Sequence, residues 1–188
     1  MFSKLTMLLL VPKCLTEQSA SFAVTFAPLK YNKANIILTE EEKNKLEIVD
    51  FGLNDIYNEG LQLIIYVNNE RYCAKEMVLL PKQACPEHKH PTRKNGDTGK
   101  QETFRCKYGM VYLYTEEENG KGDIQKPERN SKYYTAEKRI VLFPGDQYTI
   151  PANTKHWFRA GEEGAVITEF SSNSEDSSDV FTNPNIIR

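Results

Sequence analysis

The sequence predicts an all-β protein, either a sandwich or a closed barrel, with one short helix near its N-terminus. Two observations predict this fold class. Segments rich in branched and aromatic residues recur between residues 61 and 170, and clusters of glycine, proline and asparagine separate them. Only the stretch that begins at residue 39 has a clear helix-start signal. Many short strands with almost no helix favour a sandwich or a closed barrel.

The helix signal is a capping box over Thr39-Glu40-Glu41-Glu42. In this motif the threonine hydroxyl and the last glutamate accept hydrogen bonds from backbone amides that the helix start leaves without partners. Leu46 and Val49 follow at helical spacing, and Gly52 is a typical stop. We therefore expect one helix between residues 39 and 52.

The remaining elements are expected to be strands. The first two are separated by Asn68-Asn69, which predicts a β-hairpin. In chain order the expected strands cover residues 61–67, 71–80, 104–114 with an interruption at Gly109, 133–143, 147–150, 156–159 and 165–170. Turn signals separate them, among them Pro144-Gly145, Pro151 to Asn153 and Gly161 to Gly164. The serine-rich and acidic stretch from Ser171 to Asp179 is expected at the surface.

Length and charge limit the class of protein. A chain of 188 residues is long enough for one domain with its own core. We expect that domain over residues 31–188, after an N-terminal extension over residues 1–30 that is disordered or reflects a start codon assigned too far upstream. Twenty-four basic and 26 acidic residues give a net charge of −2, which offers no electrostatic basis for a nucleic-acid partner.

The N-terminus and the cysteines bear on localisation. Lys4 and the apolar run from Leu5 to Val11 resemble the start of a secretory signal, but Pro12 and Lys13 end the run near the lower length limit. The run is also far too short to span a bilayer, so no membrane partner is expected. The four cysteines are scattered without a C-x-x-C pair, which is typical of a reducing compartment. We therefore expect a cytoplasmic protein.

All three histidines of the chain stand in a pattern that suits a metal site. His88 and His90 form His-x-His, and residues two apart in a strand point to the same face. Glu102 heads the next expected strand, and His156 opens another after a Pro-Ala-Asn turn. Three imidazoles and one carboxylate suit Mn²⁺, Fe²⁺, Ni²⁺ or Zn²⁺. A six-coordinate ion would keep two positions for water or substrate, as a catalytic site requires.

At these residues the sequence resembles the cupin superfamily. The first cupin motif, G-x5-H-x-H with a later E-x6-G, is matched by His88, His90, Glu102 and Gly109. The second motif, G-x5-P-x-G-x2-H-x3-N, is matched by Gly145, Pro151 and His156. The resemblance implies the cupin double-stranded β-helix, a jelly-roll barrel, with these three histidines and Glu102 as metal ligands.

The motifs also show departures. Lys82, Asn153 and Ala160 replace two glycines and the final asparagine, and none of these positions is a metal ligand. The spacer before Glu102 is longer than usual, which leaves Glu87 as the nearest competitor. Glu87 is expected on the opposite face of the strand from the two histidines. A second competitor, Cys85, is better explained as a small semi-buried thiol than as a ligand.

Five stretches resemble one cupin family more closely, the bacterial D-lyxose isomerases. They are Gly99 to Arg105, Gln147 to Pro151, Thr154 to Phe158, Glu162 to Val166 and Asp179 to Thr182. The similarity extends from about Tyr31 to the end of the chain. It implies interconversion of D-lyxose with D-xylulose, and of D-mannose with D-fructose, through an enediolate. It also implies a small monosaccharide as the substrate and Mn²⁺ as the cofactor, for which Fe²⁺, Co²⁺, Ni²⁺ or Zn²⁺ are alternatives that suit the ligand set. The wider resemblance to cupins implies a homodimer.

Two further residues are candidates for the chemistry. Lys100 falls on the same face of an extended strand as Glu102, so it is a candidate partner for a substrate oxygen; otherwise it is a solvated lysine at a strand end. Glu169 lies in the otherwise apolar run from Ala165 to Phe170 and is the candidate base, unless it faces outward. Trp157, Phe158 and Tyr112 are expected to line the sugar pocket or, as is common in barrels, to be core.

The same residues also allow other functions. The same ligands around Fe²⁺ would suit an O₂-dependent dioxygenase, because the cupin fold does not fix the activity. A non-catalytic sugar- or metal-binding cupin would bind ligand without turnover. A phosphorylated sugar would require a cationic cluster at the site mouth, for which Arg105 and Arg159 are the candidates.

Overall fold

The computed structural model describes residues 17–94, 96–116 and 123–188, and β-strands dominate these parts of the chain. The signal-like stretch from Lys4 to Val11 lies outside the described residues. The strands are β1 (Glu47–Val49), β2 (Leu61–Asn68), β3 (Cys73–Leu79), β4 (Ala84–Lys89), β5 (Glu102–Thr115), β6 (Lys138–Leu142), β7 (Gln147–Ile150), β8 (His156–Ser171) and β9 (Val180–Phe181). The helices are α1 (Glu17–Lys33) and α2 (Glu40–Asn44), with short 3-10 turns η1 (Ser131–Tyr133) and η2 (Asp176–Ser178).

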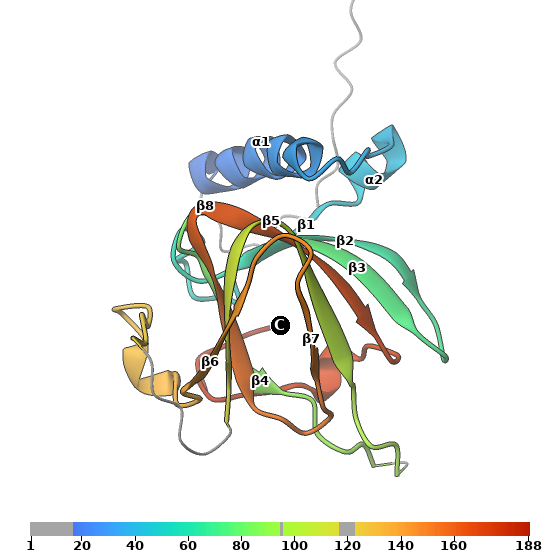
Figure 1. The fold of residues 1–188 in the computed structure, drawn as a ribbon, viewed down its shortest axis with the longest axis vertical. Coiled ribbons are helices and arrows are strands. Elements are labelled where there is room, and N and C mark those ends of the chain that lie inside the picture. The colour runs from blue at the N-terminus through green and yellow to red at the C-terminus, as the bar shows by residue number, and fades with distance from the viewer. Residues whose placement is uncertain (1–16, 95, 117–122) are drawn as a thin grey trace, which may run out of the picture.

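The strands form one antiparallel sheet that curls into a half-barrel (Figure 1). Two long strands, β5 and β8, pair with each other along most of their length. The free edge of β8 pairs first with β4 and then with β3, while the free edge of β5 pairs with β7 and β6. This arrangement confirms the predicted all-β fold with a short N-terminal helix.

The concave side of the sheet holds the main hydrophobic core. Its members alternate along the strands, so each strand turns every second side chain inward. The core includes Leu61, Leu63, Met77, Leu79, Phe104, Val111, Leu113, Ile150, Phe158 and Ile167, all at most 5% exposed. Phe104 and Phe158 meet edge-to-face with ring centroids 4.9 Å apart. Apolar residues therefore fill one part of the half-barrel, and the polar site described below occupies the rest.

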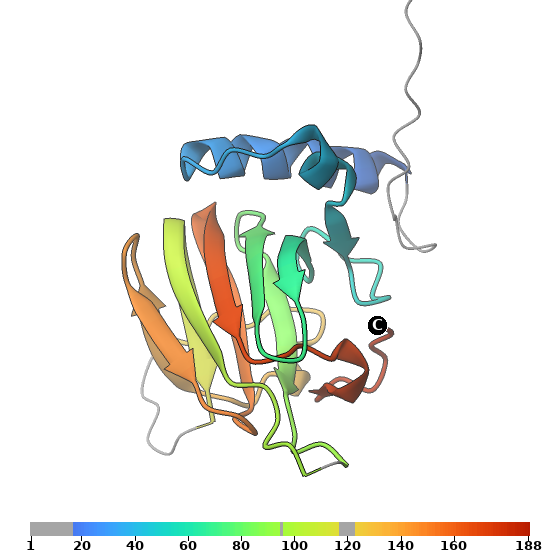
Figure 2. The same cartoon turned by 90° about the vertical axis from the view of Figure 1, so that its right-hand side faces the viewer.

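Helix α1 covers the outer face of the sheet (Figures 1 and 2). Its buried residues include Ala27 and Tyr31, which belong to one cluster with Ile64, Val78 and Val166 from β2, β3 and β8. The sequence pattern did not predict this helix, because its apolar residues show little helical periodicity and Pro28 interrupts it. Residues 17–30, in the predicted extension, make up most of α1. No helix among the described residues is long and apolar enough to cross a membrane.

The helix expected over residues 39–52 is shorter in the structure. The capping box is confirmed, because the amide of Glu42 donates to the Thr39 hydroxyl at 3.2 Å and the amide of Thr39 donates to the Glu42 carboxylate at 2.8 Å. The helix ends at Asn44, however, and β1 follows it. Leu46 and Ile48 are buried with the period of a strand, so the helical assignment beyond Asn44 was wrong.

Two glycine signals that predicted interruptions lie inside continuous strands. Residues 156–159 and 165–170 belong to the single strand β8, and Gly109 lies within β5. The pairing of the two strands jumps there from Gly109↔Ala165 to Val111↔Ala160. Gly109 and Gly164 both have positive φ, and a side chain on Gly109 would collide with the carbonyl of Gly164. These glycines therefore mark a bulge between neighbouring strands rather than a turn. The expected strand 133–143 likewise reduces to β6.

Candidate metal centre

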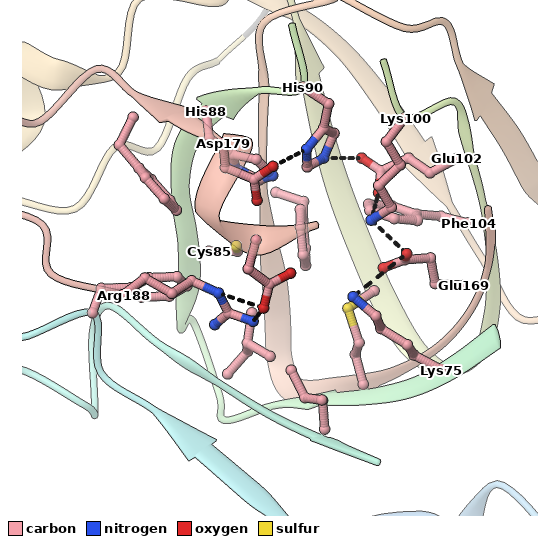
Figure 3. A pocket seen from close by; sticks show the side chains of 17 residues that line it. Lys75, Cys85, His88, His90, Lys100, Glu102, Phe104, Glu169, Asp179 and Arg188 are labelled. Atoms are coloured by element: carbon pink, nitrogen blue, oxygen red, sulfur yellow. Dashed lines mark hydrogen bonds and ion pairs between the residues drawn. The ribbon is translucent and has the colours of Figure 1, made fainter. Parts of the chain in front are cut away.

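Three strands bring the four sequence-predicted ligands together. His88 lies on β4 and His90 just beyond its end, while Glu102 begins β5 and His156 begins β8. The pairing of β4 with β8 places His88 opposite His156. One potential ligand atom from each of the four residues lies within 4.8 Å of the others, and all four residues are buried. Figure 3 shows His88, His90 and Glu102 around one end of a pocket.

The imidazole rings are held so that their Nε2 atoms face this shared point. The Nδ1 atom of His88 donates to the carbonyl of Pro86 at 2.8 Å, and that of His156 donates to the carbonyl of Thr154 at 2.9 Å. The Nδ1 atom of His90 lies 2.5 Å from a carboxylate oxygen of Asp179. A carbonyl can only accept, so the first two rings carry their proton on Nδ1 and leave Nε2 as a lone-pair donor.

The shared point also contains buried polar atoms that lack hydrogen-bond partners. Nε2 of His90, Nε2 of His156 and Oε1 of Glu102 are fully buried without a hydrogen bond. Oε1 of Glu102 lies 2.7 Å from Nε2 of His156 and 3.3 Å from Nε2 of His90. Burial, together with the other two imidazoles, holds the pKa of His88 well below its usual value. Burial would lower the pKa of His90, but Glu102 and Asp179 raise it to about 9, so a bound cation would displace a proton from this ring. Imidazole nitrogens and one carboxylate are donors that suit a divalent metal, so the residues fit such an ion.

A charged chain continues from the candidate ligands into the pocket. Nζ of Lys100 donates to Oε2 of Glu102 at 2.6 Å and lies 2.5 Å from Oε1 of Glu169 (Figure 3). All three side chains are at most 6% exposed. Burial alone would lower the pKa of Lys100, but the two carboxylates raise it above its usual value. The lysine therefore stays an ammonium. Nζ of Lys75 lies 4.0 Å from the same Glu169 oxygen.

The three aromatic residues expected in the sugar pocket separate into two places. Phe158 lines the pocket that contains the histidines. Trp157 belongs to a different cluster, in which its ring stacks on Tyr114 at 3.9 Å between centroids and its indole donates to the carbonyl of Ala136. Tyr112 packs against that same cluster. Consecutive residues of a strand face opposite sides, so Trp157 and Phe158 do not share a pocket.

The competing ligands lie elsewhere. The Glu87 side chain is on the other face of β4, where its carboxylate accepts from the amides of Thr135 and Ala136 and from the hydroxyls of Thr135 and Thr182. Cys85 belongs to the inner core, and burial raises the pKa of its thiol, so it stays protonated. Neither residue belongs to the four-residue cluster.

The C-terminal segment supplies pocket residues that the sequence patterns did not identify. Asp176, Asp179, Phe181 and Arg188 all line the pocket, and Nε of Arg188 donates to Asp176 at 3.0 Å. The stretch from Ser171 to Asp179 was expected at the surface, yet the Asp179 side chain is only 10% exposed. These contacts join positions that are far apart in the chain, so local composition carries no signal for them. In the sequence, only the stretch from Asp179 to Thr182, which resembles a known family, indicated a role for this segment.

The fold and the site together define a class of protein. A curled antiparallel sheet with a buried set of three histidines and one glutamate is a cupin-like fold with a candidate centre for a divalent metal. Solved structures of L-ribose isomerases share the fold. L-ribose isomerase of Cellulomonas parahominis superposes with a TM-score of 0.72 at 14% identity, covering 91% of this chain and 94% of the other. L-ribose isomerase of Acinetobacter sp. DL28 superposes with a TM-score of 0.71 at 16% identity, covering 92% and 94%.

The amino-acid sequence identifies the family. The profile of the D-lyxose isomerase family matches residues 22–188. The D-lyxose/D-mannose isomerase of Thermosediminibacter oceani is 59% identical over 157 residues, which cover 83% of this chain and 86% of that protein. The D-lyxose ketol-isomerase of Thermofilum sp. is 52% identical over 177 residues, which cover 93% and 97%. The chain belongs to the D-lyxose isomerase family, which confirms the resemblance drawn from the motifs.

Proposed function

We propose that this protein is a metal-dependent aldose–ketose isomerase that interconverts D-lyxose with D-xylulose and also acts on D-mannose and D-fructose. Membership of the D-lyxose isomerase family and the names of the relatives support this activity. One observation in the structure carries the proposal. A buried lysine links a carboxylate of the candidate metal centre, Glu102, to a second carboxylate, Glu169, that lines the same pocket.

The candidate metal centre would support the electrophilic half of the reaction. His88, His90, Glu102 and His156 would hold the ion, which when bound would supply a Lewis acid that polarises the sugar carbonyl. The ammonium of Lys100 lies beside Glu102 and donates hydrogen bonds in a buried setting. It would stabilise negative charge as it develops on the substrate oxygen, where low exposure to water makes the interaction strong.

Glu169 would move the proton between the two carbons. Isomerisation of an open-chain aldose removes the hydrogen on C2 as a proton and leaves an enediolate. The proton of the C2 hydroxyl then moves to the C1 oxygen, and the proton taken from C2 is returned to C1, which gives the ketose. The Glu169 carboxylate lies on one side of Lys100 and lines the pocket, so it would take the proton from C2 and deliver it to C1. The sugar would rest against Phe158, whose ring lines the same pocket.

Cofactor identity, assembly and location are part of the same proposal. We propose Mn²⁺ because a set of three imidazoles and one carboxylate suits it, with Fe²⁺, Co²⁺, Ni²⁺ or Zn²⁺ as substitutes. We propose a homodimer, which light scattering on the purified protein would measure. The free, buried thiols of Cys73, Cys85 and Cys106 support a reducing compartment such as the cytoplasm. We assign the chemistry to the domain over residues 31–188.

The proposal is tested by stripping the protein with a chelator, reloading it with Mn²⁺ and following D-lyxose conversion to D-xylulose by chromatography. Conversion should depend on the metal and be lost in His156→Ala. Glu169→Gln should retain the metal and lose about 10²–10⁴-fold in kcat. Metal binding without conversion of D-lyxose or D-mannose would contradict the isomerase. O₂ consumption by the Fe²⁺-loaded protein would then favour a dioxygenase, and saturable sugar binding alone a non-catalytic cupin.

A further inference from the structure

We propose that Asp179 is a positioning residue that couples metal binding at the histidines to docking of the C-terminal segment, residues 174–188, over the sugar pocket. The inference rests on the metal-binding part of the function proposed above. It goes beyond that function because it gives the candidate metal centre a second role, the ordering of a wall of the pocket.

The first observation is that the three histidines differ in their Nδ1 partners. His88 and His156 donate to backbone carbonyls only two residues away in their own segments. His90 instead contacts a carboxylate that lies 89 positions away in the chain, at 2.5 Å, and both side chains are nearly buried. An outer carboxylate fixes the ring and makes the opposite nitrogen a better electron donor to a metal. His90 is therefore the ligand whose strength depends on a distant segment.

The second observation is that this segment docks on β4, the strand that carries His88 and leads into His90. In β9, Phe181 pairs with His88 and Val180 pairs with Lys89. The amide of Thr182 donates to the carbonyl of Glu87 at 3.0 Å. Figure 2 shows the segment, in dark red, beside the strands at the lower right of the view. A change in the position of the segment would thus reach His90 directly.

The third observation is that the docked segment completes the pocket. Asp176, Asp179, Phe181 and Arg188 line it together with Lys100 and Glu169. Arg188 is held there by Asp176, and the amide of Ile187 donates to the carbonyl of Phe51 at 2.9 Å. The sugar therefore meets residues that are present only when the segment is docked.

These contacts make the coupling reciprocal. A cation on Nε2 of His90 would make the Nδ1 hydrogen a stronger donor to Asp179, and this would stabilise the docked segment. Thermodynamic linkage then requires that docking strengthen metal binding by the same factor. The backbone carbonyls that contact His88 and His156 lie two residues before these ligands in the chain, so they transmit no such coupling to the C-terminal segment.

The experiment combines calorimetric titration of Mn²⁺ with hydrogen exchange of the metal-free and metal-loaded full chain. Mn²⁺ should slow exchange in residues 176–188 of the unsubstituted protein. In Asp179→Ala the Mn²⁺ dissociation constant should rise about 10–100-fold, and the metal should no longer slow that exchange. Asp179→Asn keeps an acceptor oxygen, so its Mn²⁺ dissociation constant should lie between those of the unsubstituted protein and Asp179→Ala. The matched control is Glu175→Gln, which removes a carboxylate from the same segment that pairs with Arg93 rather than with a histidine.

Each outcome has one meaning. If the unsubstituted protein binds no Mn²⁺, both the proposed metal site and this inference fail. If it binds Mn²⁺ while Asp179→Ala binds it equally well, or if the metal leaves exchange in residues 176–188 unchanged, the inference fails and the isomerase proposal stands. An equal loss of affinity in Glu175→Gln would assign the effect to general loosening of the segment and overturn the role of Asp179.

Discussion

Two buried glutamates on opposite sides of the sheet wall, Glu87 and Glu102, differ in how their charge is satisfied. Glu87 accepts four hydrogen bonds from Thr135, Ala136 and Thr182, and Nζ of Lys155 lies 4.0 Å away. Glu102 accepts one hydrogen bond from Lys100. Its second oxygen has no hydrogen-bond partner and lies beside the Nε2 atoms of His90 and His156, which also lack one.

The difference teaches how to separate a structural carboxylate from a functional one. Buried polar groups in folded proteins almost always have partners, because an unpaired one costs about 1–3 kcal/mol. Glu87 obeys this rule and ties β4 to two neighbouring segments. Glu102 breaks the rule at a point where three other potential ligand atoms converge. Such an exception indicates a site that a bound cation would complete.

The largest expected effect is the difference in activity between two single variants, Glu102→Gln and Glu87→Gln. Glu102→Gln removes the charge of the candidate ligand, so we expect kcat/KM to fall by more than the roughly 10–100-fold typical of residues that contact a metal ligand. Glu87→Gln keeps one oxygen for the amides of Thr135 and Ala136, and the threonine hydroxyls can accept from the new NH₂ group. We expect the kcat/KM of Glu87→Gln to stay within about 10-fold of that of the unsubstituted protein, because 10-fold is the smallest loss typical of residues that contact a metal ligand. Steady-state assays at saturating Mn²⁺ measure both, and equal losses would contradict the contrast.

A second effect is expected on the stability of the fold. Glu87→Ala leaves two buried backbone amides and two hydroxyls without their acceptor, so we expect the free energy of unfolding to fall by about 3–5 kcal/mol. Urea unfolding of the metal-free protein measures it. Thr182→Val, which removes only one of the donors, is the control and should cost about 1 kcal/mol. A loss below about 1 kcal/mol in Glu87→Ala would show that the network is not structural.

The smallest effect concerns a third buried carboxylate, Glu76, on the outer face of the sheet. Burial raises its pKa above the usual 4.5, while a hydrogen bond from Thr168 partly offsets this. Its other oxygen has no partner. Because the folded pKa exceeds the unfolded one, the carboxylate destabilises the protein above the folded pKa and has no such effect below the unfolded pKa.

Replacing Glu76 should therefore stabilise the protein at neutral pH and above, but not in acid. Glu76→Gln should raise the free energy of unfolding at pH 7 by about 1 kcal/mol or less, since nearby charge and solvent screen the effect. The gain should disappear as pH falls below about 4.5, the usual value. Urea unfolding across that pH range measures it. A gain in the free energy of unfolding that grows on acidification would contradict this prediction. It would show that the Glu76 carboxylate, like that of Glu87, has the partners it needs.

Features that depend on neighbouring residues were predictable. The capping box at Thr39 and Glu42 formed as expected, because both partners lie within one helical turn. The shared face of His88 and His90 was also predictable, because residues two apart in a strand point to the same side. The sequence failed where local patterns conflict with pairing. Leu46 fits a helical pattern, but the strand that follows it, β1, pairs with β2. Gly164 fits a turn pattern, but it lies within β8, which pairs with β5.

The sequence by itself determined the all-β fold class, the family and the four residues that lie together at the candidate metal centre. These follow from residue types at short, regular spacings. Only the tertiary structure decided that Phe158 lines the pocket while Trp157 does not, and that Asp179 and Arg188 lie beside residues far away in the chain. Long-range neighbours are set by strand pairing and by the burial of the whole core, which no local pattern encodes.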